Sequence, residues 1–270
     1  MLGAIIGDII GSPYEFYPHN IKTTDFPLIN SYSKFTDDTV MTCAIAEALM
    51  KIMQERGNKI SEKDFEHEII KSMQKLGNRY PKAGYGQKFV HWLVSKNPKP
   101  YGSYGNGSAM RVSPIAWAFD NLEDVEKFAE ISSRVSHNHI EGIKGAKSIA
   151  GAIFLARKGK SHSEIKNYEN KYGYDLNRTL AQIRPDYRHF ESCQESVPEA
   201  IISYLEASDF ESAVRNAVSL GGDADTQAAI AGSIAEGEYL IPQNIIDECL
   251  PRLDDFLRDI VKRWQTWLKN

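Results

Sequence analysis

Two short acidic segments, far apart in the chain, carry the residue types best suited to metal chemistry. The first is Thr36-Asp37-Asp38-Thr39, and the second is Gly221-Gly222-Asp223-Ala224-Asp225-Thr226. Each places carboxylates and a threonine hydroxyl at the start of an apolar helical pattern, and oxygen ligands of this kind hold hard divalent cations such as Mg²⁺ and Mn²⁺. Together the two segments predict the binuclear metal site of a hydrolase.

The first segment also has a purely structural interpretation. It precedes an apolar stripe that begins at Val40, so it lies at a predicted helix N-terminus, where Asp and Thr cap free amides and the helix dipole favours carboxylates. One cap needs a single side chain, and Thr36, Asp37 and Asp38 exceed that need. Taken alone, this segment leaves capping and metal binding both open.

The second segment favours the metal interpretation more strongly. Gly221 and Gly222 are expected to end one helix, and a new helix is expected to open at Thr226. Asp223 and Asp225 would then project from a tight turn between two buried helices. Their carboxylates would repel each other there unless a cation lay between them.

Glu15 follows the predicted first helix in an unusual setting. Its neighbours Pro13, Tyr14 and Phe16 are largely apolar, and such surroundings can raise the pKa of a carboxyl group and suit it to proton transfer or substrate positioning. The alternative is an ordinary surface glutamate.

A glycine-rich segment, 102–111, precedes a further apolar stretch. It lacks the lysine and spacing of a P-loop and the spacing of a dinucleotide fingerprint. Its successive amides could form a nest for phosphate oxygens, or the segment is a plain flexible loop. Arg111, at its end, is suited to pairing with a carboxylate or a phosphate.

Two histidines stand in Ser136-His137-Asn138-His139, just before a predicted helix. No third soft ligand is spaced near them for zinc. We expect them to bind a sugar or stack on a base, with a solvated loop pair as the alternative. A covalent mechanism has little support, because the chain has no GxSxG elbow and no cysteine with an activating neighbour.

The elements that must position these residues are helical, because apolar residues recur at intervals of three and four and no period-two strand is evident. Gly3, Gly7 and Gly11 lie four residues apart and predict a central helix that another helix approaches closely, with Asp8 near its middle. Residues 81–114 form the least regular region. Turns are expected at Tyr80-Pro81, Asn97-Pro98-Lys99-Pro100, Arg184-Pro185, Val197-Pro198, Ile241-Pro242 and Leu250-Pro251.

Composition narrows the class of protein. The chain has 270 residues, of which 42% are hydrophobic and 25% charged, and its net charge is -4. One all-α domain spanning residues 1–270 is therefore expected, with no electrostatic reason to bind nucleic acid. No apolar run approaches the roughly 20 residues that cross a bilayer, and no secretory signal is evident. We expect a cytoplasmic protein of open oligomeric state, whose three cysteines are reduced, buried thiols.

In this order, the motifs resemble those of the ADP-ribosylglycohydrolases, the family of dinitrogenase reductase-activating glycohydrolase and the ADP-ribosylarginine hydrolases. The matching motifs, which span most of the chain, are Gly3-Ala4-Ile5-Ile6-Gly7-Asp8 with Glu15, Thr36-Asp37-Asp38-Thr39, Gly105-Asn106-Gly107 with Met110-Arg111 and Pro114, Ser136-His137-Asn138-His139, and Gly221-Gly222-Asp223-Ala224-Asp225-Thr226 with Gly232. The chain departs from the family where a small residue and a Tyr-Gly pair are common, since it has Ala235-Glu236-Gly237-Glu238-Tyr239-Leu240 there.

The resemblance implies an orthogonal multi-helix domain with two divalent cations, Mg²⁺ or Mn²⁺, at the base of a cleft. The metal ligands it implies are Thr36, Asp37, Asp38, Asp223, Asp225 and Thr226. It places Glu15 near the scissile bond, with Glu15 or a metal-ligating aspartate, Asp37 or Asp225, as the base. The substrate-binding residues it implies are Ser103, Gly105, Asn106, Gly107 and Ser108 around the pyrophosphate and His137 on the adenosine side.

The activity expected on these grounds is hydrolysis of the glycosidic bond that joins ADP-ribose to a modified protein side chain or a small molecule. The same oxygen ligands would also suit a two-metal phosphoesterase or pyrophosphatase. A third alternative is a catalytically silent protein that binds ADP-ribose.

Overall fold

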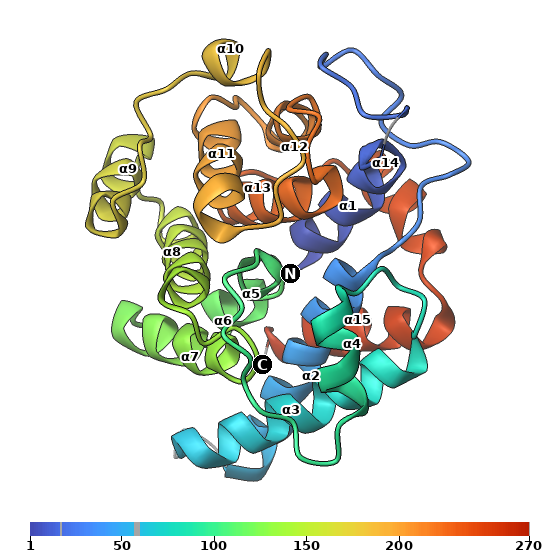
Figure 1. The fold of residues 1–270 in the computed structure, drawn as a ribbon, viewed down its shortest axis with the longest axis vertical. Coiled ribbons are helices and arrows are strands. Elements are labelled where there is room, and N and C mark those ends of the chain that lie inside the picture. The colour runs from blue at the N-terminus through green and yellow to red at the C-terminus, as the bar shows by residue number, and fades with distance from the viewer. Residues whose placement is uncertain (17, 57–59, 270) are drawn as a thin grey trace.

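The computed structural model describes residues 1–16, 18–56 and 60–269, and over these residues the protein is all-α, as expected (Figure 1). Its helices are α1 (Leu2–Gly11), η1 (Ser12–Tyr14), α2 (Asp37–Arg56), α3 (Glu62–Arg79), α4 (Gln87–Val94), α5 (Gly107–Met110), α6 (Ser113–Ala118), α7 (Leu122–Arg134), α8 (Ile140–Arg157), α9 (His162–Glu169), η2 (Asn170–Tyr172), α10 (Leu180–Ile183), α11 (Cys193–Leu205), α12 (Phe210–Val218), α13 (Ala224–Glu238), α14 (Gln243–Cys249), η3 (Leu250–Arg252) and α15 (Asp255–Trp267). Within these described ranges there is no strand, only an isolated bridge between Gly105 and Ser192.

Helices α1 and α13 form the centre of the molecule, where their backbones lie in direct contact (Figure 1). A Cβ atom on Gly7 would overlap the carbonyl oxygen of Ala228, and Gly3 and Gly11 approach the backbone of α13 just as closely. The glycine spacing of the first helix therefore serves the close packing that the sequence predicts. This contact brings the middle of α1, with Asp8, against the N-terminal half of α13.

The departure from the family pattern near the end of α13 has a structural use. Glu236 accepts hydrogen bonds from the backbone amides of Leu2 and Gly3 and from the amino group of Met1, at 2.6–3.1 Å. A carboxylate at a helix N-terminus satisfies free donors and the helix dipole. Glu236 thus fixes the start of α1 at the end of α13 that lies away from the candidate site.

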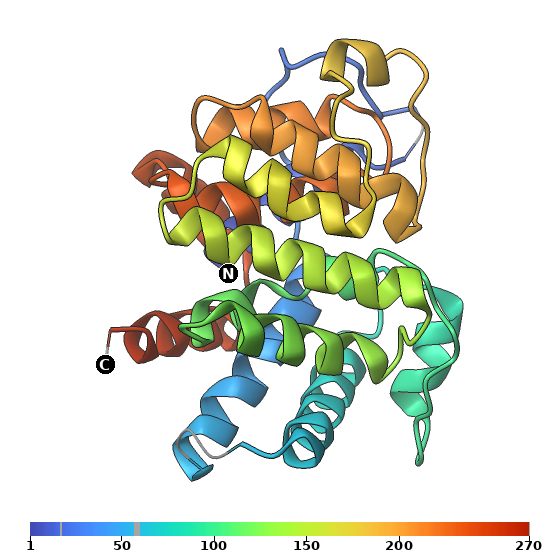
Figure 2. The same ribbon diagram turned by 90° about the vertical axis from the view of Figure 1, so that its left-hand side faces the viewer.

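The remaining long helices surround this pair. Helix α8 packs against α7, which lies below it in Figure 2, and also against α11 and α13. Helix α2 packs between α3 and α15. The three cysteines are free and buried, as expected. No helix among the described residues is both long and apolar enough to cross a membrane.

The helical stripes were predicted well, but some boundaries were not. The turn predicted at Val197-Pro198 is wrong, because Pro198 lies inside α11. The side chains of Val197 and Ala200 are fully buried, and this packing outweighs the one backbone hydrogen bond that proline forgoes. Helix α13 begins at Ala224 rather than at Thr226. The irregular region 81–114 also contains the helix α4.

Candidate active site

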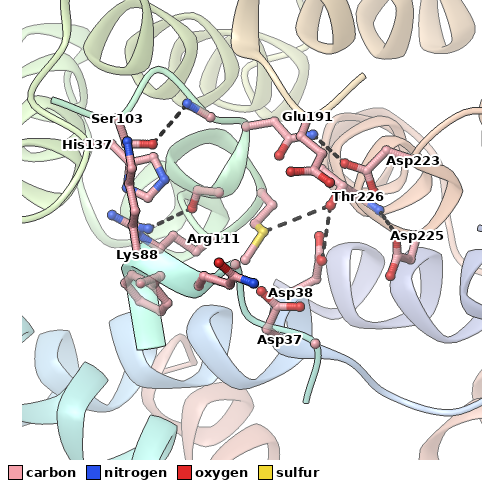
Figure 3. Close-up of a pocket in the computed structure, with 18 of the residues that line it drawn as sticks. Asp37, Asp38, Lys88, Ser103, Arg111, His137, Glu191, Asp223, Asp225 and Thr226 are labelled. Carbon is pink, nitrogen blue, oxygen red and sulfur yellow. Dashed lines mark hydrogen bonds between the residues drawn. The ribbon is translucent and has the colours of Figure 1, made fainter. Parts of the chain in front are cut away.

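A cavity of about 340 Å³ opens where the N-termini of α2, α5 and α13 converge. Figure 3 shows its two ends, with Asp223 and Asp225 at one and Arg111 and His137 at the other. Polar side chains from segments more than a hundred residues apart line one space. A concave site of this size with convergent polar groups suits a small ligand.

At the start of α2, the capping carboxylate comes from another helix. Asp8 of α1 accepts hydrogen bonds from the backbone amides of Thr36 and Thr39 at 2.9 and 3.1 Å and from the hydroxyl groups of both residues. Asp37 and Asp38 are therefore not needed as caps. This arrangement removes the capping interpretation of the first acidic segment and leaves its two carboxylates available to the cavity.

The two acidic segments meet, as the metal hypothesis requires. Ligand oxygens of Asp8, Asp38 and Asp225 lie within 4.8 Å of one another, and so do those of Glu15, Asp223 and Asp225. Asp225 belongs to both groups. Thr226 donates a hydrogen bond from Oγ1 to Asp38 Oδ2 at 3.2 Å and so links the segments directly.

Burial and mutual repulsion raise the pKa values of these carboxyl groups. Burial, then the charge of Asp225, raises the pKa of Asp38 and of Asp223 well above the ordinary value. The same two causes raise the pKa of Glu15 to about 9. The largest charge effects on these three groups come from other carboxylates. Lys88 and Arg111 line the same cavity, but neither forms an ion pair with the cluster among the described residues.

This donor set fits divalent cations. The ligands are oxygens, Asp38 Oδ1 is buried without a hydrogen-bond partner among the described residues, and the cluster carries unbalanced negative charge. Hard cations such as Mg²⁺ and Mn²⁺ select such sites. Asp8 differs from the others, because its two oxygens already accept four hydrogen bonds. It orients Thr36 and the start of α2.

Asp37 lines the same cavity but stands outside both groups of three carboxylates. Its backbone amide donates to the carbonyl of Ala83 at 2.9 Å. Gly84 has φ of 117°, and a Cβ atom there would lie 3.0 Å from Asp37 Oδ1. Only glycine adopts this backbone conformation readily, so the 83–84 turn is able to pass beside the Asp37 carboxylate.

The turn before α13 is held from two sides. Gly221 has φ of 65°, which allows the chain to reverse after α12. Asn106 Nδ2 donates to Asp223 Oδ2 at 2.7 Å. Asp223, at the N-cap position, makes no capping bond with its own side chain. The glycine-rich loop therefore braces the second acidic segment, a role for Asn106 that adds to its predicted contact with substrate.

The wall at the other end of the cavity is lined by Ser103, Gly105, Gly107 and His137, which the sequence predicts to bind substrate. Ser108 is different, since it lies outside this lining and its hydroxyl lies 2.8 Å from the carbonyl oxygen of Gly142, to which it donates. Its side chain supports the loop from behind.

The two histidines have separate roles. His137 is buried beside the cavity, and burial, with the nearby charge of Arg111, lowers its pKa well below the ordinary value. His139 is exposed and caps α8 by accepting a bond from the amide of Glu141. The alternative prediction, in which both histidines are solvated in a loop, is therefore wrong for His137.

Arg111 is fully buried and has no carboxylate partner within the described residues. Its guanidinium donates to the carbonyl oxygens of Gly107 and Ser132 and to Ser136 Oγ, at 2.7–3.0 Å. Burial lowers its pKa to about 10, so the group stays charged at neutral pH. The sequence predicts that Arg111 pairs with a carboxylate or with a phosphate. Among the described residues, no carboxylate pairs with it.

Sequence reasoning left several site residues unassigned. Asp8 was noted in the first helix without a role, although a carboxylate between glycines on a buried helix face is a usable signal. Lys88, Phe89, Tyr101 and Glu191 also line the cavity. Nothing in their local sequence marks them, because folding alone brings them to the wall.

The chain is similar to several known proteins. The family model described as ADP-ribosylglycohydrolase matches residues 1–270. The chain is 28% identical over 313 residues to human ADP-ribosylhydrolase ARH3, covering 90% of this chain and 85% of the relative. It is 25% identical over 257 residues to the ADP-ribosyl-[dinitrogen reductase] glycohydrolase of Rhodospirillum rubrum, covering 88% and 83%. A solved structure titled ADP-ribosylglycohydrolase-related protein complex shares the fold, with a TM-score of 0.67 at 23% identity over 96% of this chain and 94% of that one.

Proposed function

The chain belongs to the ADP-ribosylglycohydrolase family and is an enzyme of that class, and from this premise we propose that it uses two divalent cations, Mg²⁺ or Mn²⁺, to release ADP-ribose. The bond cleaved is the glycosidic bond between the ribose and a modified protein side chain or a small molecule. Residues 1–270 act as one domain in this proposal.

One observation carries the proposal. Carboxylates from three segments, at Glu15, Asp38, and the pair Asp223 and Asp225, are brought together, and no Lys or Arg among the described residues forms an ion pair with them. Such a group is unfavourable unless protons or metal ions occupy it. Two bound cations would offset the repulsion among these carboxylates. This end of the cavity would then bind ligand more strongly than the rest of it.

The residues proposed to hold the cations are Thr36, Asp37, Asp38, Asp223, Asp225 and Thr226. Bound cations would orient the ribose hydroxyls and a water molecule and would offset developing charge. Asp8 keeps the Thr36 side chain in place, since Thr36 Oγ1 donates to Asp8 Oδ1 at 2.7 Å and keeps its lone pairs free. Asn106 does the same for Asp223 through its 2.7 Å bond.

In the reaction, a water oxygen forms a bond to the anomeric carbon while the bond to the leaving group breaks. A proton of the water passes to a base, which returns it to the leaving group. Glu15 is the proposed base, with Asp37 or Asp225 as the alternatives. Bound cations would offset the carboxylate charges that, after burial, raise the pKa of Glu15, and would so let it ionise. The ribose ring develops positive charge in such a step, and the surrounding carboxylates stabilise it. The 103–107 loop is proposed to bind the diphosphate.

A panel of linkages tests the proposal. The purified protein, with Mg²⁺ or Mn²⁺, is incubated with arginine-, serine- and acid-linked ADP-ribose compounds, beside Asp225→Ala. We expect wild type to release ADP-ribose from at least one linkage and the variant to release none. Phosphate release from ADP-ribose instead would indicate a phosphoesterase. Calorimetric binding of ADP-ribose with no product at high protein concentration would indicate a silent binding protein.

A further inference from the structure

Arg111, Ser136 and His137 form a chain of hydrogen bonds that ends on the histidine ring. Arg111 Nη2 donates to Ser136 Oγ at 3.0 Å, and Ser136 Oγ lies 2.8 Å from His137 Nδ1. All three residues are buried, so water does not compete for these bonds. The protons that the three groups can supply therefore decide the direction of each bond.

The hydroxyl proton of Ser136 fixes that direction. A guanidinium has donors only, so Arg111 uses a lone pair of Ser136 Oγ and leaves the hydroxyl proton free. The described residues offer this proton no acceptor except His137 Nδ1. Buried donors are rarely left unpaired, so the proton goes to Nδ1, which must then be the bare nitrogen. The single proton of the neutral ring is left on Nε2.

Arg111 also helps to keep the ring neutral. Burial of the ring, and then the charge of Arg111, lowers the pKa of His137 and so disfavours a second proton. Arg111 in turn is held by three acceptors and balanced by no carboxylate among the described residues. The same side chain thus affects the charge of His137 and, through Ser136, sets its tautomer.

The Nε2 edge of the ring faces the glycine loop. A Cβ atom would lie 3.1 Å from Nε2 if placed on Gly107 and 3.6 Å if placed on Gly105, and all three residues line the cavity. Figure 3 shows His137 between Ser103 and Arg111 on the wall opposite Asp223. No hydrogen bond within the described part of the chain uses Nε2, so its proton is left for a ligand.

We propose that Arg111 and Ser136 are positioning residues that hold His137 as the neutral Nε2–H tautomer, so that the ring donates one hydrogen bond to an acceptor atom of the bound ligand. The identity of the ligand, an ADP-ribose compound with phosphate, ribose and adenine acceptors, rests on the proposed function. The tautomer itself is a property of the protein without ligand. The opposite tautomer would present a lone pair to the same acceptor and repel it.

The first test is nitrogen NMR of the full-length protein labelled at its histidines, at neutral pH and without ligand. The ring signals of His137 are identified by their loss in His137→Gln. We expect a bare Nδ1 and a protonated Nε2. A protonated Nδ1, or two protonated nitrogens, overturns the proposal. This measurement needs no catalytic activity, so its failure is distinct from failure of the proposed function.

The second test compares variants by calorimetric binding of ADP-ribose in Mg²⁺. Ser136→Ala removes the relay and is expected to weaken binding about fivefold, the effect of one hydrogen bond. Ser132→Ala is the matched control, because this buried hydroxyl donates only to the carbonyl of Ala129, while the bond from Arg111 goes to the backbone carbonyl of Ser132, which the substitution keeps. Binding should be unchanged in this variant. Equal binding by wild type and Ser136→Ala, with the same ring signals, overturns the role of Ser136.

A third comparison examines the donor directly. His137→Gln can place an N–H group where Nε2 stands, whereas His137→Asn is too short to reach it. We expect His137→Gln to bind ADP-ribose more tightly than His137→Asn. Equal weakening in the two variants, with both folded by circular dichroism, contradicts donation from Nε2.

Discussion

Glu169 and the carboxylates around Asp225 are buried in two separate regions, and the two regions accommodate negative charge in different ways. Glu169 of α9 is fully buried, accepts one hydrogen bond from Ser148 Oγ of α8 at 2.5 Å, and has its pKa raised by burial to about 8. It is a single group that can keep its proton at neutral pH. The cavity instead gathers several carboxylates whose own charges oppose one another.

This difference explains why only one of the two regions is a candidate metal site. A lone buried carboxyl becomes neutral by holding a proton. In the cluster, Asp38 and Asp223 are buried and also face the charge of Asp225, so the charge on one carboxyl group affects its neighbours. An unpartnered oxygen does not separate the two regions, because Glu169 Oε1 and Asp38 Oδ1 both lack a hydrogen-bond partner in the described structure. Cluster geometry, rather than burial alone, distinguishes a binding site from a structural acid.

The largest expected effect comes from Asp225→Asn. Asp225 belongs to both groups of three carboxylates, so its loss should reduce ADP-ribose release about a thousandfold or more. In EDTA the same variant should be more stable to urea than wild type, by about 1–3 kcal/mol, because a repelling charge is gone.

Glu169→Gln is the matched control for this loss of activity. It also removes one buried carboxyl, but it should keep wild-type turnover. Two results would contradict this comparison: Asp225→Asn keeps a tenth of the activity, or both variants lose activity equally. Either result would mean that the cavity is no more important for activity than the contact between Glu169 of α9 and Ser148 of α8, called the α8–α9 contact below.

Glu169→Gln should also change how stability depends on pH. The folded pKa of about 8 lies above the ordinary 4.5, so between these values the folded state holds a proton that the unfolded state has lost. Stability therefore falls as pH rises through this window, on the order of 3 kcal/mol from pH 5 to pH 8 for this group. Urea denaturation at pH 5 and pH 8 should show a smaller fall in the free energy of unfolding for Glu169→Gln than for wild type. An equal fall in the two proteins would contradict a buried, protonated Glu169.

Metal addition should affect the cavity and leave the α8–α9 contact unaffected. Mg²⁺ or Mn²⁺ at a hundred times its Kd is expected to stabilise the folded protein by about 2.7 kcal/mol, which corresponds to a rise in melting temperature of about 5 °C. The rise should persist in Glu169→Gln and vanish in Asp225→Asn. A melting temperature that is the same in EDTA and in either metal speaks against the site.

The smallest effect is expected from Asn106→Ala. This change removes the 2.7 Å bond that holds Asp223, and loss of a group that orients a metal ligand weakens metal affinity about tenfold. Manganese titration followed by calorimetry measures it. Ser108→Ala is the companion variant, because Ser108 also lies on the glycine loop but donates to backbone carbonyls behind it. Equal metal affinity in wild type and Asn106→Ala would remove Asn106 from the support of the site.

Much of the site was predictable, because the two acidic segments and the glycine loop carry short motifs whose order can be followed in the sequence. Periodicity likewise predicted helix α2 from the apolar stripe that begins at Val40, but it did not mark every helix, and α4 lies in the region that was predicted to be irregular. What could not be predicted was the use of each side chain. Ser108 and His139 stand in the same motifs as Gly107 and His137, yet one supports the loop from behind and the other caps a helix.

The sequence by itself determined the helical class, the close packing of the first helix and the oxygen-bearing residue types of the two acidic segments, because helix periodicity, glycine spacing and side-chain chemistry are local properties. The tertiary structure alone decided that Asp8 caps α2 and so frees Asp37 and Asp38, that Glu15 joins Asp223 and Asp225, and that Arg111 lies without a carboxylate partner within the described structure. Each of these outcomes depends on which groups meet across segments distant in the chain. Burial then fixes the charge, the proton and the hydrogen bond that each group keeps.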